Sequence, residues 1–171
     1  MRIPAPEPAV PERAADSRIG RVRLALFQPD IAGNAGNMLR TAAGLGVAVD
    51  LIGPLGFAFD DRRLRRAGMD YLKQAAIVRH TSWESFRGML GARRLILLTT
   101  KGETAYADFA FQAGDTILVG RESEGASEEV HARADARLRI PLKAGLRSLN
   151  VAAAAAMVLG EALRQLDGFP Q

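Results

Sequence analysis

The sequence predicts one α/β domain built on a mostly parallel sheet with helices on both faces. From Val22 onward, short apolar runs alternate with stretches of helical periodicity, and strands separated by helices are typical of parallel sheets whose two faces are covered. The chain has 171 residues, of which 48% are hydrophobic and 25% charged. This length and composition suit a single globular domain with one continuous core.

The first twenty residues differ in composition from the rest. They contain four prolines, charges of both signs and few apolar side chains. We therefore expect residues 1–20 to form a disordered tail and residues 21–171 to form the domain. The tail lacks the apolar central stretch of a secretory signal, so nothing in it indicates export.

The first elements of the domain follow from local patterns. Val22–Phe27 is an apolar run of strand length, and Pro29–Asn34 is a polar loop in which Asn34 could cap the next helix. Asn37–Leu45 has helical periodicity and ends beside a glycine, at position 44 or 46. Val47–Ile52 is the second predicted strand.

The middle of the chain continues this alternation. Asp60–Arg66 could form a short basic helix, and Ala75–Val78 a third strand. The stretch Thr81–Glu84 matches a capping box that opens a helix ending at Leu90. Leu95–Thr99 is the clearest strand of the sequence.

The last elements complete the pattern. Thr116–Val119 is another predicted strand, and Ser127 is placed to cap a short helix. Leu138–Ile140 ends the last strand, and an alanine-rich helix follows from Leu149 to Leu166.

Residue usage excludes several kinds of chemistry. The sequence has no cysteine, which removes disulfides, thiolate nucleophiles and cysteine-containing zinc sites, and which fits a reducing cytoplasm. Its two histidines, His80 and His131, stand in polar stretches without a second ligand at metal spacing, and we interpret them as surface or turn residues. We expect neither a metal nor a Ser-His-Asp triad. No apolar run approaches the ~20 residues of a membrane span, so we expect a soluble protein.

Arginine accounts for the basic charge. The formal net charge is +4, and the 23 basic residues comprise 20 arginines and 3 lysines. Arginine suits phosphate through its planar guanidinium, so a polyanionic partner is one interpretation. A genome rich in G and C is the other, since its codons favour arginine.

The common dinucleotide-binding fold is not indicated. Its fingerprint is a glycine-rich turn after a strand and before a helix, whereas Gly44-Leu45-Gly46 follows a predicted helix and precedes a predicted strand. Helix termination explains these glycines better. Thr100-Lys101-Gly102 does not match a phosphate-binding P-loop either, so a nucleotide-like ligand would need another kind of pocket.

Polar residues and glycines gather in three loops, each following a predicted strand, where ligands of parallel sheets bind. The ordinary explanation of each loop is a capped turn, with Asn34, Ser127 and Ser148 as helix N-caps. Their order along the chain carries more information than any one of them. The loops are Pro29–Arg40, Gly120–Gly125 and Pro141–Asn150.

Three motifs in these loops resemble those of the SPOUT methyltransferases that modify ribose. They are Asn34-x-Gly-Asn-x-x-Arg40, Gly120-x-Glu-x-x-Gly125, and Ile140-Pro followed by Arg147-Ser-Leu-Asn150. Between them, Gly56–Tyr71 resembles a segment particular to the TrmL branch of that family, which acts on the tRNA wobble nucleotide. The resemblance covers residues 23–166, and the proline-rich tail and Arg121 depart from it.

This resemblance implies a fold, a cofactor and an assembly. It implies a C-terminal deep trefoil knot, a rare feature of protein chains, and a homodimer whose active sites form at the two-fold interface. It also implies that the knot loops bind S-adenosylmethionine, a cofactor without phosphate. By position, the cofactor pocket would be lined by Leu98, Gly120, Ile140 and Ser148.

The resemblance further implies 2′-O-methylation of the wobble nucleotide of tRNA, a cytidine or modified uridine at position 34. Arg40 matches the family's catalytic arginine, and it shares a helical face with Asn37. A guanidinium with a pKa above ~12 is a poor proton acceptor, so we expect electrostatic stabilisation rather than base catalysis. Asn34, Glu122 and Asn150 match polar positions that would orient Arg40, the knot loops or the nucleotide.

The densest charge cluster of the domain is formed by Arg62, Arg63, Arg65 and Arg66. A solvated helical face with Asp61 and Arg65 paired is one explanation. Beside a methyltransferase site, contact with tRNA phosphates is the interpretation we prefer, chiefly for Arg62, Arg65 and Arg66.

Two other functions remain compatible with the sequence. The same chemistry could act on another tRNA position or on ribosomal RNA, although the short chain argues mildly for the wobble branch, since relatives with other targets often carry an added RNA-binding domain. A non-catalytic RNA-binding module would keep the fold alone. The intact motif residues, Arg40 among them, argue against that module, because binding alone has no chemical need of them.

Overall fold

The computed structural model describes residues 22–58 and 76–171. The predicted tail, residues 1–20, lies outside the described residues. So do the predicted basic helix Asp60–Arg66 and the start of the predicted strand at Ala75.

Within the described part of the chain, seven strands form one sheet in which all pairs are parallel. Their order across the sheet is β3-β2-β1-β6-β4-β7-β5. This confirms the predicted parallel α/β fold. The strands are β1 (Val22–Phe27), β2 (Ala48–Ile52), β3 (Ile77–His80), β4 (Leu95–Leu98), β5 (Thr104–Ala105), β6 (Asp115–Val119) and β7 (Ala136–Arg139).

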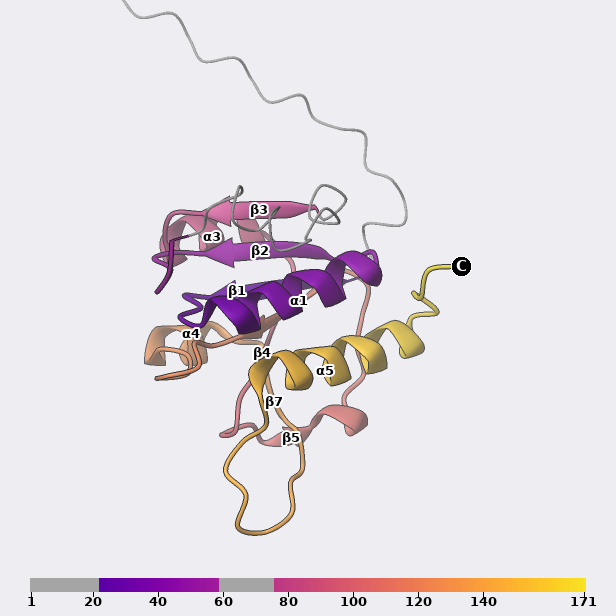
Figure 1. The fold of residues 1–171 in the computed structure, drawn as a ribbon. Coiled ribbons are helices and arrows are strands. Elements are labelled where there is room, and N and C mark those ends of the chain that lie inside the picture. Colours follow the sequence, from indigo (N-terminus) through magenta and orange to yellow (C-terminus); the bar gives the residue numbers. More distant parts are fainter. Residues whose placement is uncertain (1–21, 59–75) are drawn as a thin grey trace, which may run out of the picture.

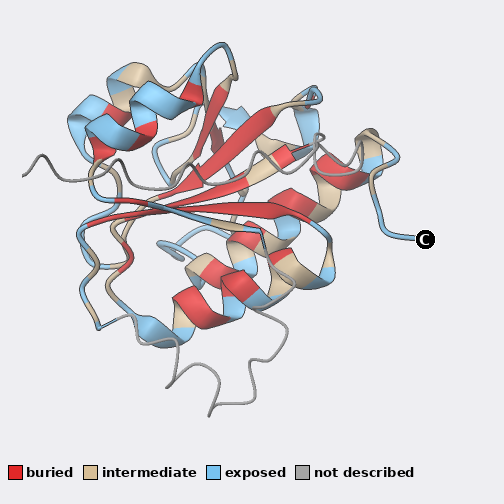
Figure 2. Cartoon of the chain, turned by 90° about the horizontal axis from the view of Figure 1, so that it is seen from above, coloured by how far each residue is buried: buried red, intermediate tan, exposed pale blue. Residues whose placement is uncertain are grey.

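Helices cover both faces of the sheet, as predicted. One face is covered by α1 and α5, which contact each other, and the opposite face by α3 and α4 (Figures 1 and 2). Among the described residues, no helix is long and apolar enough to cross a membrane. The helices are α1 (Ala32–Gly44), α3 (Trp83–Leu90), α4 (Glu128–Arg133), α5 (Val151–Gln165) and the 3-10 turn η2 (Tyr106–Asp108).

The side chains of β1 alternate between two cores, because successive residues of a strand point to opposite faces. Leu24 and Leu26 are fully buried in the core under α1 and α5. Phe27 belongs to the other core, where its ring meets Trp83 edge-on at 5.9 Å and Trp83 packs against Phe86 of α3. Burial on both faces explains why the strands are continuous apolar runs in the sequence.

The strand order determines where a ligand can bind. The chain runs outward from β1 through β2 to β3, and later returns so that β6 pairs with the other side of β1. In open parallel sheets, ligands bind beyond the carboxyl ends of the strands at such a reversal. Here that edge carries the loops after β1, β4, β6 and β7.

Asn34 does not cap α1, which corrects the prediction. The helix begins at Ala32, with the extended residue Ile31 as N-cap and no side-chain cap. Ala35 N donates to Ile31 O at 3.1 Å, so the backbone closes the first turn and the side chain of Asn34 is left for another contact. The predicted end is confirmed, since α1 ends at Gly44 and Gly46 has φ 66°.

Two further caps differ from prediction, and one agrees. Asn150, rather than Ser148, caps α5, and the helix starts at Val151 instead of Leu149. Ser82, rather than Thr81, caps α3 by accepting a hydrogen bond from Ser85 N at 3.2 Å. The predicted cap Ser127 of α4 is confirmed.

His80 is buried, which corrects our interpretation of it as a surface residue. Its polar sequence neighbours suggested exposure, but its ring packs edge-on against Phe86 of α3 at 5.3 Å. His80 Nε2 lies 2.9 Å from Asp50 Oδ1, and Arg23 Nε donates to Asp50 Oδ2 at 2.7 Å. Burial raises the pKa of Asp50, but hydrogen bonds from Arg23 and His80 outweigh it and leave this pKa below its ordinary value.

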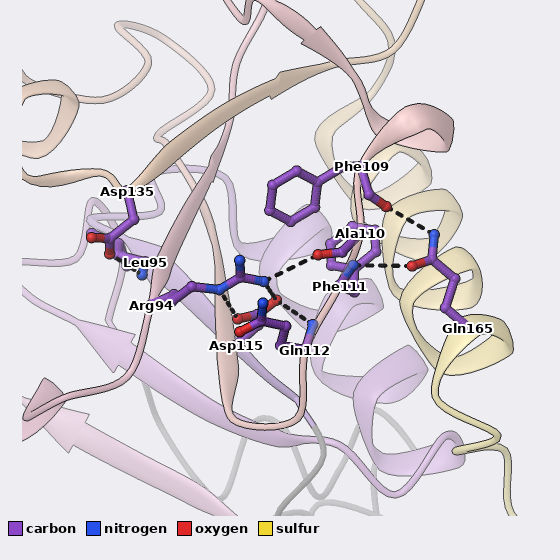
Figure 3. A network of polar contacts seen from close by, with 9 residues as sticks. All are labelled: Arg94, Leu95, Phe109, Ala110, Phe111, Gln112, Asp115, Asp135 and Gln165. Atoms are coloured by element: carbon purple, nitrogen blue, oxygen red, sulfur yellow. Dashed lines mark hydrogen bonds and ion pairs between the residues drawn. The ribbon is translucent and has the colours of Figure 1, made fainter.

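A polar network holds the amino-terminal edge of the sheet, opposite the loops described above (Figure 3). Arg94 donates to both carboxylate oxygens of the buried Asp115, at 2.8 and 2.7 Å. Gln165 of α5 donates to Phe109 O at 2.9 Å and accepts from Phe111 N at 3.0 Å. These bonds tie the segment before β6 to the sheet and to α5, so we assign this network a structural role.

Candidate active site

A cavity of about 840 Å³ opens at the carboxyl edge of the sheet. Its walls are the loops after β4, β6 and β7 and the first turn of α5. The long loop between β7 and α5 extends away from the body of the domain (Figure 1). The volume lies within the range of small-molecule sites, ~300 to 1,000 Å³.

The structure brings most of the predicted site residues to this cavity. Arg40 is not among the residues that line it. The predicted RNA-binding residues Arg62, Arg65 and Arg66 lie outside the described residues. The predicted residues that line the cavity are Asn34, Leu98, Gly120, Glu122, Ile140, Ser148 and Asn150.

The cavity has apolar walls at the strand ends. Leu98 is the last residue of β4, Val119 is the last residue of β6, and Ile140 follows β7 directly. All three lie at the end of a strand or directly after it, so the sheet fixes their positions. An uncharged aromatic ring system would find apolar contact here without a phosphate-binding loop.

Gly120 lets the loop after β6 fold back on itself. A Cβ at this position would lie 2.5 Å from Ala126 N and 2.5 Å from Gly125 C. Arg121 N donates to Gly125 O at 3.2 Å and Gly125 N donates to Arg121 O at 2.9 Å, so the loop is closed by its own backbone. A side chain at position 120 would force this closed loop away from the cavity.

Asn150 joins the third motif to the first. Its Oδ1 accepts from Ala152 N at 2.9 Å and from Ala153 N at 3.2 Å, which caps α5. Its Nδ2 donates to Asn34 Oδ1 at 2.9 Å. Because the amide oxygen is occupied by the cap, the amino group is the part that faces Asn34. The two asparagines therefore form one polar unit at the cavity wall.

Glu122 is bonded to Asp30, a residue that our sequence analysis did not select. Asp30 N donates to Glu122 Oε2 at 3.3 Å, and Glu122 N donates to Asp30 Oδ1 at 3.1 Å. The side chains of Glu122 and, next, Ser123 lower the pKa of Asp30 to about 2. Burial, and then the contact with Asp30, raise the pKa of Glu122. Glu122 is therefore the weaker acid of the two.

Asp30 could not be singled out from local sequence. It stands in the first of the three polar loops, directly after Pro29, where a turn aspartate is ordinary. Its partner is 92 residues away along the chain. The only usable signal was that both loops follow strands of the same parallel sheet.

Arg40 lies on the exposed side of α1. Gly33, Asn37, Arg40 and Gly44 are exposed and recur at the spacing of one helical face, which confirms that Asn37 and Arg40 share a face. On the neighbouring α5, exposed residues recur in the same way. We call these two exposed stripes together the α1–α5 surface; its α5 members are Ala153, Met157 and Arg164.

The cavity residues do not indicate a metal. In residues 22–58 and 76–171, no group of three His, Asp or Glu side chains is placed to hold a metal ion. His131 lies on α4, partly buried, and lines the cavity rather than forming a turn. The mouth is instead basic: Lys101, Arg139 and Arg147 line the same cavity.

Comparison with known proteins agrees with these motifs. The sequence model of the SpoU rRNA Methylase family matches residues 21–160. The chain belongs to this family. It is 58% identical over 148 residues, 85% of this chain and 92% of the relative, to a tRNA (cytidine(34)-2′-O)-methyltransferase of Beijerinckia indica.

Solved members of the family share the fold. One, described as giving structural insights into the 2-OH methylation of C/U34 on tRNA, has a TM-score of 0.81 at 41% identity and covers 87% of this chain and 98% of its own. The SpoU methyltransferase AviRb of Streptomyces viridochromogenes, in complex with the cofactor AdoMet, has a TM-score of 0.74 at 27% identity. That match covers 89% of this chain and 63% of AviRb.

Proposed function

We propose that this chain methylates the ribose 2′-oxygen of the nucleotide at position 34 of tRNA, a cytidine or modified uridine, with S-adenosylmethionine as the methyl donor. The observation that carries the proposal is the cavity at the carboxyl edge of the sheet, which all three motif loops help to line. A relative that matches over almost its whole length is named for this reaction at cytidine 34.

The cavity residues fit S-adenosylmethionine, which when bound would supply an electrophilic methyl group. Leu98 and Ile140 offer apolar contact to its adenine, and Gly120 lets the loop after β6 fold back on itself beside them because that residue has no side chain. Ser148 adds a hydroxyl at the wall. This set needs no phosphate cradle, in agreement with the chemistry of the cofactor.

The residues of the chain position the ribose and offset charge. As the 2′-hydroxyl reacts, negative charge develops on its oxygen, and a fixed cation nearby stabilises that charge. We assign this role to the guanidinium of Arg40, which stays protonated and donates hydrogen bonds. Asn34 and Asn150, bonded to each other, orient the two motifs around it.

The proposal includes a homodimer. Arg40 belongs to the α1–α5 surface and not to the cavity wall of its own chain, so pairing of this surface across a two-fold axis would carry it to the cavity of the second copy. Gly33 and Ala153 allow two helices to approach closely, and Met157 is an apolar residue 40% exposed on the same surface. Light scattering at micromolar concentration should give the mass of a dimer, and an active monomer would contradict this arrangement.

The remaining features of the proposal concern the chain path and the RNA. The placement of β6 between β1 and β4, together with the long loop before α5, supports a C-terminal trefoil knot. We expect phosphates of tRNA to contact Lys101, Arg139 and Arg147, which line the cavity, and also Arg62, Arg65 and Arg66. A tRNA substrate sets the reaction in the cytoplasm, and residues 1–20 take no part in it.

Methyl transfer to defined tRNAs tests the proposal. We expect the purified protein to transfer a labelled methyl group to tRNA from cells that lack this activity, with the label mapping to the ribose at position 34. The matched control is a tRNA with 2′-deoxycytidine at that position, which lacks the accepting oxygen and should stay unlabelled. Label at another tRNA position or in ribosomal RNA would support the second candidate target. Binding of tRNA without any transfer would support a non-catalytic module.

A further inference from the structure

Three loops of different origin meet at Asp30. The loop after β1 provides Asp30 itself, and the loop after β6 provides Glu122 and Ser123, whose Oγ donates to Asp30 Oδ2. The loop after β2 provides Gly56, whose N donates to Pro29 O at 3.0 Å. A Cβ on Gly56 would lie 2.6 Å from Asp30 Cβ, so the backbone of the loop after β2 packs directly against Asp30.

A second contact links the same two loops. Gln28 directly follows β1 and has a left-handed conformation, with φ 45°, which is uncommon for a residue with a side chain and is found where the surrounding structure holds it. Gln28 Oε1 accepts from Arg121 Nη2 at 3.0 Å. Together with Asp30 and Glu122, this contact fixes the loop that leads into α1 against the loop that lines the cavity.

Asp30 and Glu122 are held together by backbone donors, because each carboxylate accepts a hydrogen bond from the backbone N of the other residue. Arg121, which precedes Glu122, bonds Glu124 at 2.9 Å. Glu122 Oε1 is buried and has no hydrogen-bond partner among the described residues. Asp30 is thus the partner that holds the Glu122 loop in place, and after burial it is the next cause that raises the pKa of Glu122.

We propose that Asp30 is a positioning residue of methyl transfer, which anchors the Glu122 loop beside the cavity and acts through Glu122. Asp30 is not among the residues that line the cavity, so it is not placed to touch the cofactor or the ribose. The assignment to methyl transfer rests on the proposed function. The anchoring itself is a property of the fold and can be measured without the reaction.

The first test is a double-mutant cycle on the rate. With saturating cofactor and tRNA, Asp30→Asn should lower kcat at least tenfold in the wild-type background and less than twofold in the Glu122→Ala background. Asp108→Ala is the matched control, because Asp108 is an exposed aspartate on η2 away from the cavity, and it should leave kcat unchanged. Equal losses from Asp30→Asn in both backgrounds would overturn the proposal.

The second test follows the carboxyl group of Glu122 by NMR in protein labelled with ¹³C-glutamate, with its signal assigned by its loss in Glu122→Ala. Asp30→Asn should shift the titration midpoint of Glu122 to lower pH, since the substitution removes the neighbouring carboxylate that raises the pKa of Glu122. Ser123→Ala should shift it in the same direction by less, and serves if Asp30→Asn does not fold. An unchanged midpoint in folded protein would refute the anchor. A wild-type protein that transfers no methyl group would refute the proposed function and leave this measurement valid.

Discussion

Gly120→Ala should weaken cofactor binding, because the added side chain would displace the backbone of the loop after β6. The added Cβ would lie 2.5 Å from Ala126 N and from Gly125 C. Ordinary contact begins at 3.4 Å, so these two backbone atoms would have to move 0.9 Å away from the new Cβ. These are backbone atoms, so no side-chain rotation relieves the overlap. A misplacement of about 1 Å in a site can lower its activity on the order of 100-fold. We expect an effect of the same size on S-adenosylhomocysteine, the product left when S-adenosylmethionine gives up its methyl group, which should bind roughly 100-fold more weakly. That factor corresponds to about 2.8 kcal/mol.

Calorimetric titration with S-adenosylhomocysteine measures this effect directly, with thermal unfolding of each variant recorded alongside. Gly88→Ala is the matched control, because Gly88 lies within α3 and a Cβ there would meet nothing within 4 Å. It should leave the affinity unchanged and stabilise the fold by ~0.5 to 1 kcal/mol. Gly120→Ala that binds within threefold of wild type would refute the reasoning, since it would show that the loop moves 0.9 Å without disturbing the pocket.

Four further predictions follow from the site and the fold. Arg40→Ala should lower methyl transfer by orders of magnitude while calorimetry shows unchanged cofactor affinity, and Arg40→Lys should recover little, because lysine lacks the planar fork; a defect traced wholly to cofactor binding would contradict this. Changing Arg65 and Arg66 together to alanine should weaken tRNA binding and reduce the slope of log affinity against log salt by about two, one for each lost phosphate contact; an unchanged slope would count against those contacts. Since the pKa of Asp50 is lowered in the folded protein, its ion pairs stabilise the protein above the unfolded pKa of ~3.9, and this stabilisation is lost as pH falls through the folded pKa. The free energy of unfolding, measured in urea, should therefore fall more steeply with decreasing pH in wild type than in Asp50→Asn. Deletion of residues 1–18 should leave the methylation rate within twofold of the full chain, and a large loss in folded protein would mean that the tail binds RNA.

Local sequence patterns predicted the fold and the edge of the sheet where the site lies. The strands are apolar on both faces because helices cover both, and runs such as Val22–Phe27 therefore stand out from the polar loops between them. In a parallel sheet, the carboxyl ends of all strands lie at one edge. The polar loops that follow the strands had to gather there, whatever the order of the strands.

Contacts between distant residues were not predictable in the same way. Ser148 and Asn150 can both cap a helix, and the choice of Asn150 becomes clear only with Asn34, 116 residues earlier, which takes its amino group. His80 appeared to be a surface residue because its burial depends on a helix that follows it and on Asp50 in another strand. Asp30 was missed for the same reason, since its role depends on its contact with the distant residue Glu122. A pattern within one segment carries no information about such partners.

The pairing of β1 with β6 has a consequence for the order in which the chain can fold during synthesis. Val22 pairs with Asp115, so one side of the central strand stays without its partner until 93 more residues have been made, as 115 − 22 gives. At ~5 to 20 residues per second, that interval lasts roughly 5 to 19 s. Throughout it, the apolar face that α5 will cover is also open, because α5 follows β6 in the chain and is made after it. The part of the molecule that ends up most deeply buried is thus exposed for longest while the protein is being made, and any factor that shields nascent chains would have to act on β1 and α1.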